Sequence, residues 1–382
     1  MKILFLLENY YPFIGGAEVL FKQLCDGLAA GGHSVTVVTS LLPGTPERET
    51  SNGVEIVRIK TPYRASRYWF TFLAVPHAFR LAKGADIIQT TTYNGAFPAW
   101  LASKLRRRKC LITVHEIIGE GWKDMQRMNR FMAALHRFLE WLIVALPFDR
   151  YVSVSQFTAG RLEKYGIRPE RISVVYNGVD NELFNPAAAD GKAVRQKLGL
   201  KDEFVYLYFG RPGIAKGLEY LIKAVPAIAS ILPGSKMLLI LGKEPADGYK
   251  KILDLIAALK VGQHILRIDP VPRGELPGHI AAADCVVVPS VSEGFGFSAA
   301  EACAMDRPVV ASRVASLPEV VSGKFVLVEP GNAAALAEGV IKAHRKEFNV
   351  SEKKAFSWRG CVDNYDKIYR QVLSNSAGGD KR

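Results

Sequence analysis

The chain of 382 residues has few long apolar runs. Its first apolar run, residues 3–7, is too short for the hydrophobic region of a signal peptide and fits a buried strand. The longest apolar stretch, residues 131–148, is interrupted by His136, Arg137 and Glu140, so it does not make a clean membrane span. These absences argue against a secreted protein and against an integral membrane protein.

Cysteine is scarce, and neither cysteine nor histidine forms a metal-binding pattern. The five cysteines are scattered without a C-x-x-C pair, and the seven histidines form no H-E-x-x-H motif. Scattered cysteines are typical of proteins from reducing compartments. We therefore expect a cytoplasmic protein without a structural metal. At this length the chain can form two or three domains, each with a core of its own.

Acidic residues are scarce in residues 58–150, which hold 16 Lys and Arg against 6 Asp and Glu, a net charge of +10 in a chain of net charge +13. Four of the five tryptophans lie in the same stretch. Basic residues mixed with interfacial aromatics fit an anionic membrane surface, while a solvated basic face over core aromatics is the plain alternative. No RRM-like, zinc-finger or helix-turn-helix signature is present, so nucleic acid is not an expected partner.

Strand patterns alternate with helical patterns along most of the chain, in two halves. This alternation predicts an α/β protein with a doubly wound parallel sheet in each half. Helical patterns between the strands include residues 217–232 and 249–259. The expected strands are 3–7, 35–39, 55–59, 86–89, 110–114 and 151–154 in the first half, then 204–209, 237–241, 265–268, 285–289, 309–311 and 325–328.

The alanine-rich segment 185–196 has no strand pattern and is the expected linker between the halves. Open parallel sheets bind ligands at the carboxyl ends of their strands. Two such domains in tandem would face each other across an interdomain cleft, which is the default position for a ligand site.

Glycines and a histidine mark candidate positions in the first half. Gly15 and Gly16 follow the first strand and open the first helix, where a backbone can approach a phosphate or a sugar, although a tight structural turn is the alternative. His115 ends a predicted buried strand and could donate a hydrogen bond to a substrate, unless it is a core histidine. The G-x-G-x-x-G fingerprint is absent, and the second strand ends without an acidic residue, so a dehydrogenase is disfavoured.

Two cations and two carboxylates mark the second half. Arg211 and Lys216 follow a predicted strand, and a guanidinium with an ammonium at such a position suits a diphosphate. Glu293 and Glu301 flank a Gly-Phe-Gly turn whose amides could reach a phosphate. Ser298 and Glu301 also match a capping box, which would give Glu301 a purely structural role.

Together these segments resemble the retaining glycosyltransferases of the GT4 family, which have the GT-B fold of two Rossmann-like domains. The resemblance runs nearly end to end and is most specific in the E-x7-E element. It implies an acceptor-side domain of residues 1–185 plus a returning helix of residues 360–382, and a nucleotide-sugar domain of residues 186–359. The matching pieces are GGAE (15–18), His115, NGVD (177–180), GR…KG (210–217), EGFGFSAAEACA (293–304) and FSW (356–358).

The resemblance assigns roles residue by residue. Glu301 would hold the ribose hydroxyls, Glu293 the hydroxyls of the donor sugar, and His115 the 6-hydroxyl of that sugar. Arg211 and Lys216 would neutralise the diphosphate, and the backbone of Gly16 would reach the phosphates. The other donor-binding positions that it implies are Gly15, Asn177, Phe295, Gly296, Phe297 and Ser298.

Two departures from the family pattern leave the donor open. His115 is followed by Glu116 where the family often has Asp, and Phe297-Ser298 stands where Leu-Pro or Leu-Val is frequent. No Asp-x-Asp motif occurs, which agrees with cationic side chains replacing a divalent metal, so neither a metal nor a cofactor is expected. For this family the resemblance implies retention of configuration through a same-face attack.

The expected activity is therefore transfer of a hexose or related sugar from a UDP- or GDP-sugar to a hydroxyl acceptor. A nucleotide-sugar 2-epimerase and a non-catalytic nucleotide-sugar or glycan binding protein are the alternatives. The basic stretch suggests a lipid-linked or membrane-surface acceptor and a peripheral position on the inner face of a membrane, while the sequence leaves a lipid, a glycan chain and a small metabolite open as the acceptor. The residues expected at that acceptor or membrane face are Arg64, Arg67, Trp69, Arg106, Arg107, Arg108 and Lys109.

Overall fold

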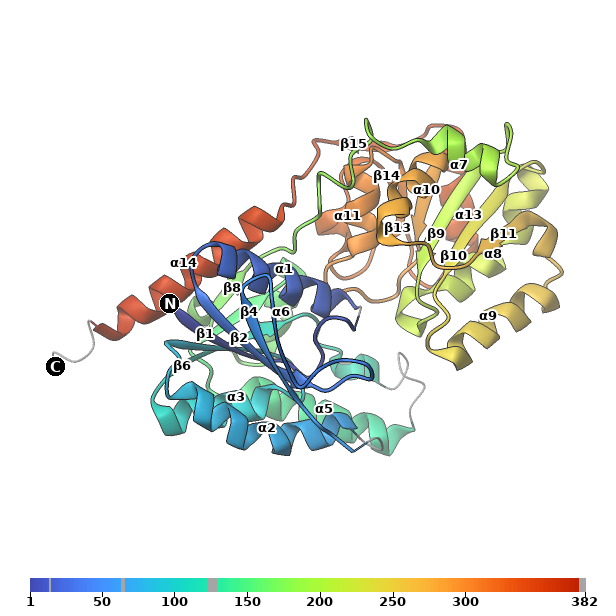
Figure 1. Cartoon of the computed structure of the whole chain (residues 1–382). Helices are drawn as coiled ribbons and strands as arrows, with labels where there is room; N and C mark the ends of the chain where they lie inside the picture. Colours follow the sequence, from blue (N-terminus) through green and yellow to red (C-terminus); the bar gives the residue numbers. More distant parts are fainter. Residues whose placement is uncertain (14, 63–65, 123–128, 378–382) are drawn as a thin grey trace. The chain divides into compact units, whose positions relative to one another are not determined.

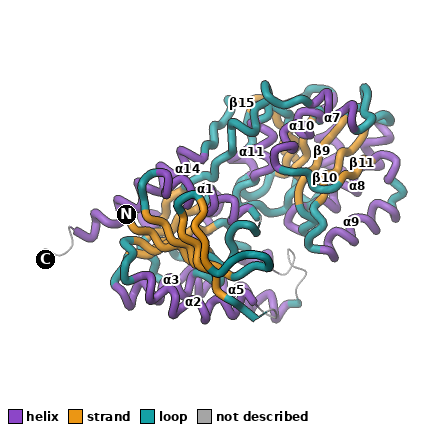
Figure 2. Tube along the Cα trace, viewed as in Figure 1, coloured by secondary structure: helices purple, strands orange, loops and turns teal. Residues whose placement is uncertain are grey.

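The computed structural model describes residues 1–13, 15–62, 66–122 and 129–377, and the side chains at 66, 67, 376 and 377 lie outside the described part. The chain divides into two compact units, both drawn in Figure 1. Unit 1 is Met1–Gly178 with Ser357–Arg382, and unit 2 is Val179–Phe356. In both units helices cover the faces of a central sheet (Figure 2).

Unit 1 is built on an eight-stranded sheet with the order β3-β4-β2-β1-β5-β6-β7-β8. Only β3 runs antiparallel, against β4. The central strands are almost continuously apolar because both of their faces are covered. The strands are β1 (Lys2–Leu6), β2 (Ser34–Ser40), β3 (Arg48–Ser51), β4 (Val54–Ile59), β5 (Ile87–Thr91), β6 (Lys109–Val114), β7 (Arg150–Ser153) and β8 (Ile172–Val174).

The helices of unit 1 lie on both faces of this sheet, as right-handed crossovers require. Two of them, α1 (Gly16–Ala30) and α14 (Trp358–Ala377), pack against each other on one face. The other face carries α2, α3 and α5, which Figure 1 shows together, and α6. These helices are α2 (Ser66–Ala82), α3 (Ala96–Arg106), α5 (Arg130–Ala145) and α6 (Gln156–Lys164).

The last helix, α14, belongs to unit 1 through buried polar contacts as well as packing. The Tyr365 hydroxyl lies 2.9 Å from Oγ1 of Thr113, and Tyr369 donates to Oε1 of Gln89 at 3.3 Å. Both tyrosine side chains are fully buried. The helix begins at Trp358, the last residue of the FSW segment, and belongs to unit 1.

Unit 2 repeats the architecture with a seven-stranded sheet in the order β11-β10-β9-β12-β13-β14-β15. Its strands are parallel except β15, which runs antiparallel to β14. The strands are β9 (Val205–Gly210), β10 (Lys236–Leu241), β11 (Ile265–Ile268), β12 (Cys285–Val288), β13 (Val309–Ser312), β14 (Gly323–Val328) and β15 (Asn349–Ser351).

The helices of unit 2 again form two layers. The apolar sides of α8 (Leu218–Ile231), α9 (Ala246–Ala258) and α13 (Ala333–His344) share one core with the strands. Right-handed crossovers put α10 and α11 on the opposite face, where α7 packs on α10. The remaining helices are α7 (Gly191–Lys197), α10 (Leu276–Ala282), α11 (Phe297–Ala304) and α12 (Leu317–Val320).

The predicted strands are confirmed to within about two residues at either end, but three short strands were missed. The missed strands β3, β8 and β15 lie at sheet edges, and β3 and β15 are antiparallel. An edge strand need not be apolar, since one of its sides faces solvent. For this reason the sequences RETS and NVS gave no strand signal.

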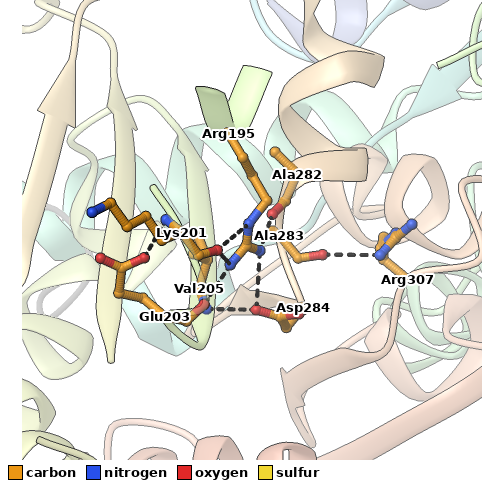
Figure 3. A network of polar contacts seen from close by, with 8 residues as sticks. All are labelled: Arg195, Lys201, Glu203, Val205, Ala282, Ala283, Asp284 and Arg307. Atoms are coloured by element: carbon orange, nitrogen blue, oxygen red, sulfur yellow. Dashed lines mark hydrogen bonds and ion pairs between the residues drawn. The ribbon is translucent and has the colours of Figure 1, made fainter. Parts of the chain in front are cut away.

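The expected linker, residues 185–196, lies inside unit 2 and enters α7. Arg195 of α7 donates to the carbonyl oxygens of Lys201 (3.1 Å) and Ala282 (2.8 Å), as Figure 3 shows. Asp284 lies in the same network and accepts from the amide of Val205 at 2.7 Å. Because one guanidinium joins α7 to the beginning of β9 and the end of α10, this segment is part of the unit, and the chain divides at Gly178–Val179 and Phe356–Ser357 instead.

No helix within the described ranges is long and apolar enough to cross a membrane. Residues 131–148, the longest apolar stretch, form most of the surface helix α5. All five cysteines are free and buried.

Candidate active site

The candidate site of unit 2 lies where the winding of its sheet reverses. The chain goes from β9 to β10 on one side, and later returns to place β12 on the other side of β9. Loops that follow two such neighbouring strands diverge above the sheet and leave room for a ligand. The loop after β9 carries Arg211 and Lys216, and the loop after β12 carries Glu293.

These two loops are held together by close backbone contacts. The amide of Val291 donates to the carbonyl oxygen of Ala215 at 2.8 Å. Gly217 has a φ of +63°, and a Cβ there would lie 1.9 Å from the carbonyl oxygen of Pro289. Only glycine can therefore bring the loop that carries Lys216 this close to the end of β12.

We expect Gly217→Ala to destabilise unit 2 by about 4 kcal/mol or more, because left-handed strain is joined by a backbone clash. Gly199→Ala is the matched control, since Gly199 has a φ of +69° and open space around its Cβ position. That control should lose only about 1–2 kcal/mol. Urea unfolding followed by circular dichroism measures both, and equal losses would contradict the close approach of the two loops.

Lys216 and Glu293 form an ion pair at this junction. The Lys216 ammonium lies 2.6 Å from Oε1 and 2.9 Å from Oε2 of Glu293. The Glu293 side chain is mostly buried and that of Lys216 is about one-third exposed. The sequence analysis assigned both residues to one site, with Lys216 on the diphosphate and Glu293 on the hydroxyls of the donor sugar. In the structure they form an ion pair with each other.

The turn before α11 places a helix N-terminus beside this ion pair. Gly296 has a φ of +99° and precedes Phe297, the first residue of the helix. The Ser316 hydroxyl bonds the carbonyl oxygens of Glu293 (3.1 Å) and Phe295 (2.9 Å) and so fixes the turn. The first amides of a helix have no intrahelical acceptor and attract an anion, so this end of α11 suits a phosphate.

Glu301 lies on α11 and is almost fully buried, with 3% of its surface exposed. Burial raises the pKa of Glu301, and the adjacent Arg273 opposes that rise. Arg273 donates to Oε1 of Glu301 at 2.9 Å, and its guanidinium also lies 5.1 Å from the ring centre of Phe184. Oε2 of Glu301 has no partner among the described residues.

The structure overturns the capping-box alternative for Glu301. The helix starts at Phe297 with Gly296 as its N-cap, so Ser298 lies inside the first turn instead of before it. The Glu301 carboxylate turns to Arg273 and makes no capping bond. The sequence analysis missed Arg273, although the rule that selected Arg211, a cation in the loop after a strand, applies to Arg273 after β11 as well.

Arg211 follows β9 directly, as predicted. Its side chain is exposed and forms no ion pair with any residue in the described ranges. Its carbonyl oxygen accepts from the Tyr208 hydroxyl at 3.1 Å and from the amide of Gly213 at 2.9 Å. The backbone here is therefore fixed while the guanidinium is available to an anion.

Four of the residues predicted to contact the donor lie in unit 1. Gly15 is the N-cap of α1 and Gly16 its first residue. His115 follows β6 and contacts the edge of Phe21 of α1 at 5.7 Å between ring centres. Asn177 is buried, and its Oδ1 has no hydrogen-bond partner among the described residues.

His115 is neutral at physiological pH. Burial lowers its pKa to about 4, and its Nε2 is buried without a partner in the described part of the chain. A neutral imidazole has one N–H donor and one acceptor nitrogen. The ring could therefore donate to a ligand hydroxyl, as the sequence suggested, without carrying a charge.

The loop after β6 is anchored by a residue that the sequence analysis did not select for the site. Glu140 of α5 is 3% exposed, and its carboxylate accepts from the amides of Ile118 (2.9 Å) and Gly119 (2.8 Å). The hydroxyls of Tyr165 (3.1 Å) and Tyr93 (3.5 Å) also reach it. A glutamate within an apolar helix was visible in the sequence, but its partners were not.

The basic residues predicted to form one acceptor or membrane face do not gather in one place. Residues 106–109 join the end of α3 to the start of β6, at the amino edge of the sheet, whereas Trp69 lies near the start of α2, at the opposite edge. Arg106 and Arg108 donate to the carbonyl oxygens of Phe79 (3.0 Å) and Lys83 (2.7 Å).

The remaining described members of that predicted set do not all lie together either. Lys109 pairs with Asp149 at 3.0 Å, and Arg107 caps α3 in the left-handed conformation with a φ of 52°. Trp69 is about half exposed. Arg64 and the side chain of Arg67 lie outside the described residues.

Comparison with known proteins gives a consistent result for both units. Residues 14–183 match the model of Glycosyltransferase Family 4, and residues 190–357 match that of Glycosyl transferases group 1. A D-inositol 3-phosphate glycosyltransferase of Acidothermus cellulolyticus is 32% identical over 94% of this chain and 86% of its own length.

Solved structures share the fold. Sucrose-phosphate synthase from Thermosynechococcus elongatus superposes with a TM-score of 0.81 at 22% identity, over 98% of this chain and all of its own. Anabaena HepE, solved in complex with UDP-glucose, has a TM-score of 0.72 at 20% identity over 99% of both chains. The fold is GT-B, and the chain belongs to glycosyltransferase family 4 and is a glycosyltransferase.

Proposed function

We propose that the protein transfers a hexose or related sugar from a UDP- or GDP-sugar to a hydroxyl acceptor, with retention of configuration and without a metal. The observation that carries the proposal is the arrangement of two carboxylate–cation pairs, Glu293–Lys216 and Glu301–Arg273, about the N-terminus of α11. Similar proteins support it, since HepE was solved with UDP and with UDP-glucose.

The cations and the helix end take the diphosphate in this proposal. Arg211 and Lys216 carry the positive charge, and the amides at 295–298 add the partial positive charge of the α11 terminus. Cleavage of the sugar–phosphate bond leaves an extra negative charge on the nucleoside diphosphate. Cations fixed in advance stabilise that charge as it develops, and this is the main electrostatic contribution.

The carboxylates take hydroxyl groups. Arg273 occupies Oε1 of Glu301 and leaves Oε2 as an acceptor for a ribose hydroxyl. Glu293 would accept from hydroxyls of the donor sugar once Lys216 turns toward the diphosphate. In unit 1, Gly15 and Gly16 would approach the phosphates at the start of α1, Asn177 would contribute to donor binding, and neutral His115 would donate to the 6-hydroxyl.

No residue of the proposed site is an obvious covalent nucleophile, because both glutamates are paired with cations. A same-face attack, in which the departing phosphate oxygen receives the acceptor proton, needs no such nucleophile. The acceptor is proposed to be a lipid-linked or glycan hydroxyl compound, and the buried free cysteines support a cytoplasmic location.

A panel of UDP- and GDP-sugars tests the proposal. We expect one donor to raise the melting temperature and to be hydrolysed or transferred in the presence of EDTA. A product of the same donor inverted at C2, seen by NMR, would assign the protein to the 2-epimerases instead. Binding without turnover on any acceptor would leave a nucleotide-sugar binding protein, and activity that EDTA abolishes would remove the metal-free mechanism.

A further inference from the structure

Helix α5 has its large apolar side chains on the solvent side. Residues 131, 135, 138, 139 and 142 form one stripe along the helix, and all of them are exposed. The exposed fraction reaches 76% for Phe131 and 55% for Phe138. The side that faces the core buries only Ala133, Glu140 and Val144. A surface helix of a globular protein normally has the reverse arrangement.

Helix α2 shows the same inversion on the same face of the sheet (Figure 1). It buries Phe70 and three alanines spaced four residues apart, and exposes Tyr68, Trp69 and Phe72, the last of these at 64%. Its Thr71 donates to the carbonyl oxygen of Asn94 at 3.2 Å, beside α3. We call the exposed side chains of Tyr68, Trp69, Phe72, Phe131, Phe138 and Trp141 the apolar face.

The helices that carry or adjoin the apolar face are almost free of acidic residues. Helices α2 and α3 contain no Asp or Glu, and the single acidic residue of α5, Glu140, is buried against backbone amides. Arg130 and Arg137, seven residues apart, flank the apolar stripe of α5. They also line a hollow of about 690 Å³ together with Lys164 and with Glu120, which pairs with Arg137 at 3.5 Å.

We infer that the apolar face docks on an anionic lipid bilayer. Aromatic and aliphatic side chains would enter the boundary between headgroups and acyl chains, while arginines beside them would meet phosphate groups, as in interfacial helices. Glu120 lies beside this face but is paired with Arg137, and the lining of the hollow still has a net positive charge from Arg130, Arg137 and Lys164, which attracts anionic lipids. A second copy of the chain would gain no charge complementarity from two such basic faces, so the bilayer is the partner that the charges favour.

This inference rests on the proposed function and adds to it. Docking on a bilayer would bring the loop after β6 near a lipid-linked acceptor. It keeps Trp69 from the membrane face expected from the sequence and replaces residues 106–109 with the exposed side chains of α2 and α5. Vesicle binding is measured without turnover, so its failure is distinguishable from a failure of the transferase proposal.

Flotation of the full chain with vesicles tests the inference. We expect binding to vesicles of phosphatidylcholine with 30% phosphatidylglycerol, weaker binding at high salt, and little binding to phosphatidylcholine alone. The double variant Phe131→Ser with Phe138→Ser should bind about tenfold more weakly or worse, and Arg130→Glu about fivefold more weakly.

The matched control is Ile231→Ser with Val350→Ser, two exposed apolar residues of unit 2, which should bind like the wild type. Equal binding by the Phe131/Phe138 variant, or no binding by the wild type, would overturn the inference. So would a dimeric mass in light scattering that becomes monomeric in the Phe131/Phe138 variant, because the face would then be an interface between two copies.

Discussion

Lys216→Ala is expected to lower kcat/KM for the donor by about 10³-fold, because it removes a fixed cation from the charge that develops on the leaving diphosphate. The change also leaves the mostly buried Glu293 without its partner. Both effects act on the bound donor, and neither requires loss of the fold. Steady-state transfer or donor hydrolysis measures the change, and the melting temperature reports on folding.

Two further variants separate catalysis from simple charge balance. If Lys216 served only to neutralise Glu293, the double variant Lys216→Ala with Glu293→Gln would recover activity, and we expect no recovery. Lys243→Ala is the matched control, because Lys243 forms a 2.9 Å pair with Asp269 in the same unit but on the open surface. Full activity of Lys216→Ala would remove this residue from the site.

Glu140→Ala is expected to lower the free energy of unfolding by about 3–4 kcal/mol. The substitution leaves the amides of Ile118 and Gly119 without their acceptor, and each buried donor that is left unpaired costs about 1–3 kcal/mol. The loop that follows His115 should loosen as a result. Chemical unfolding measures the loss, and susceptibility of this loop to limited proteolysis should rise with it.

A milder substitution of Glu140 and a control at an exposed glutamate test whether the loss comes from the missing acceptor. Glu140→Gln keeps one acceptor oxygen but brings an NH2 group toward donors, so its loss should fall between those of the wild type and the alanine variant. Glu163→Ala, at an exposed position of α6, should stay within about 0.5 kcal/mol of the wild type. Equal stability of the Glu140→Ala and Glu163→Ala variants would contradict the anchoring role.

The sequence predicted the central strands well because they are continuous apolar runs. In β1, β9 and β10 nearly every residue is buried, and a run of this kind gives a signal without any knowledge of its neighbours. Edge strands such as β3 and β15 are defined by hydrogen bonds to a partner strand. Those bonds depend on tertiary structure and leave no pattern in the four residues of β3 or the three of β15.

The sequence predicted where the candidate site residues lie relative to strands and helices, but it did not predict which of them form ion pairs with each other. Arg211, Lys216, Glu293 and Gly296 were selected because they follow strands or open a helix, and the structure places them there. The pairing of Lys216 with Glu293 spans 77 positions, and that of Arg273 with Glu301 spans 28. Nothing local in the sequence specifies such a contact, which arises only when β9, β12 and the end of β11 take their places in one sheet.

The described residues predicted for one basic face do not lie together, for a geometric reason. Charge was counted along the chain, whereas a β–α–β unit sends alternate loops to opposite edges of its sheet. Residues 106–109 and Trp69 belong to the same basic stretch of the sequence. Residues 106–109 lie at the amino edge of the sheet, however, and Trp69 lies near the start of α2, at the carboxyl edge. The exposed apolar stripe of α5 was also hidden in the sequence, because periodicity shows an apolar side without showing which way it faces.

The position of α14 at the end of the described sequence affects the order in which the two units are completed during synthesis. Unit 2 is one continuous segment, Val179–Phe356, whereas unit 1 lacks α14 until residues 358–377 have been made. Domains generally fold as units during synthesis, from the N-terminal end first. Here unit 1, which precedes unit 2 in the sequence, is completed last. The surface of β5 and β6 beside α1 that receives Tyr365 and Tyr369 therefore stays uncovered while unit 2 is synthesised.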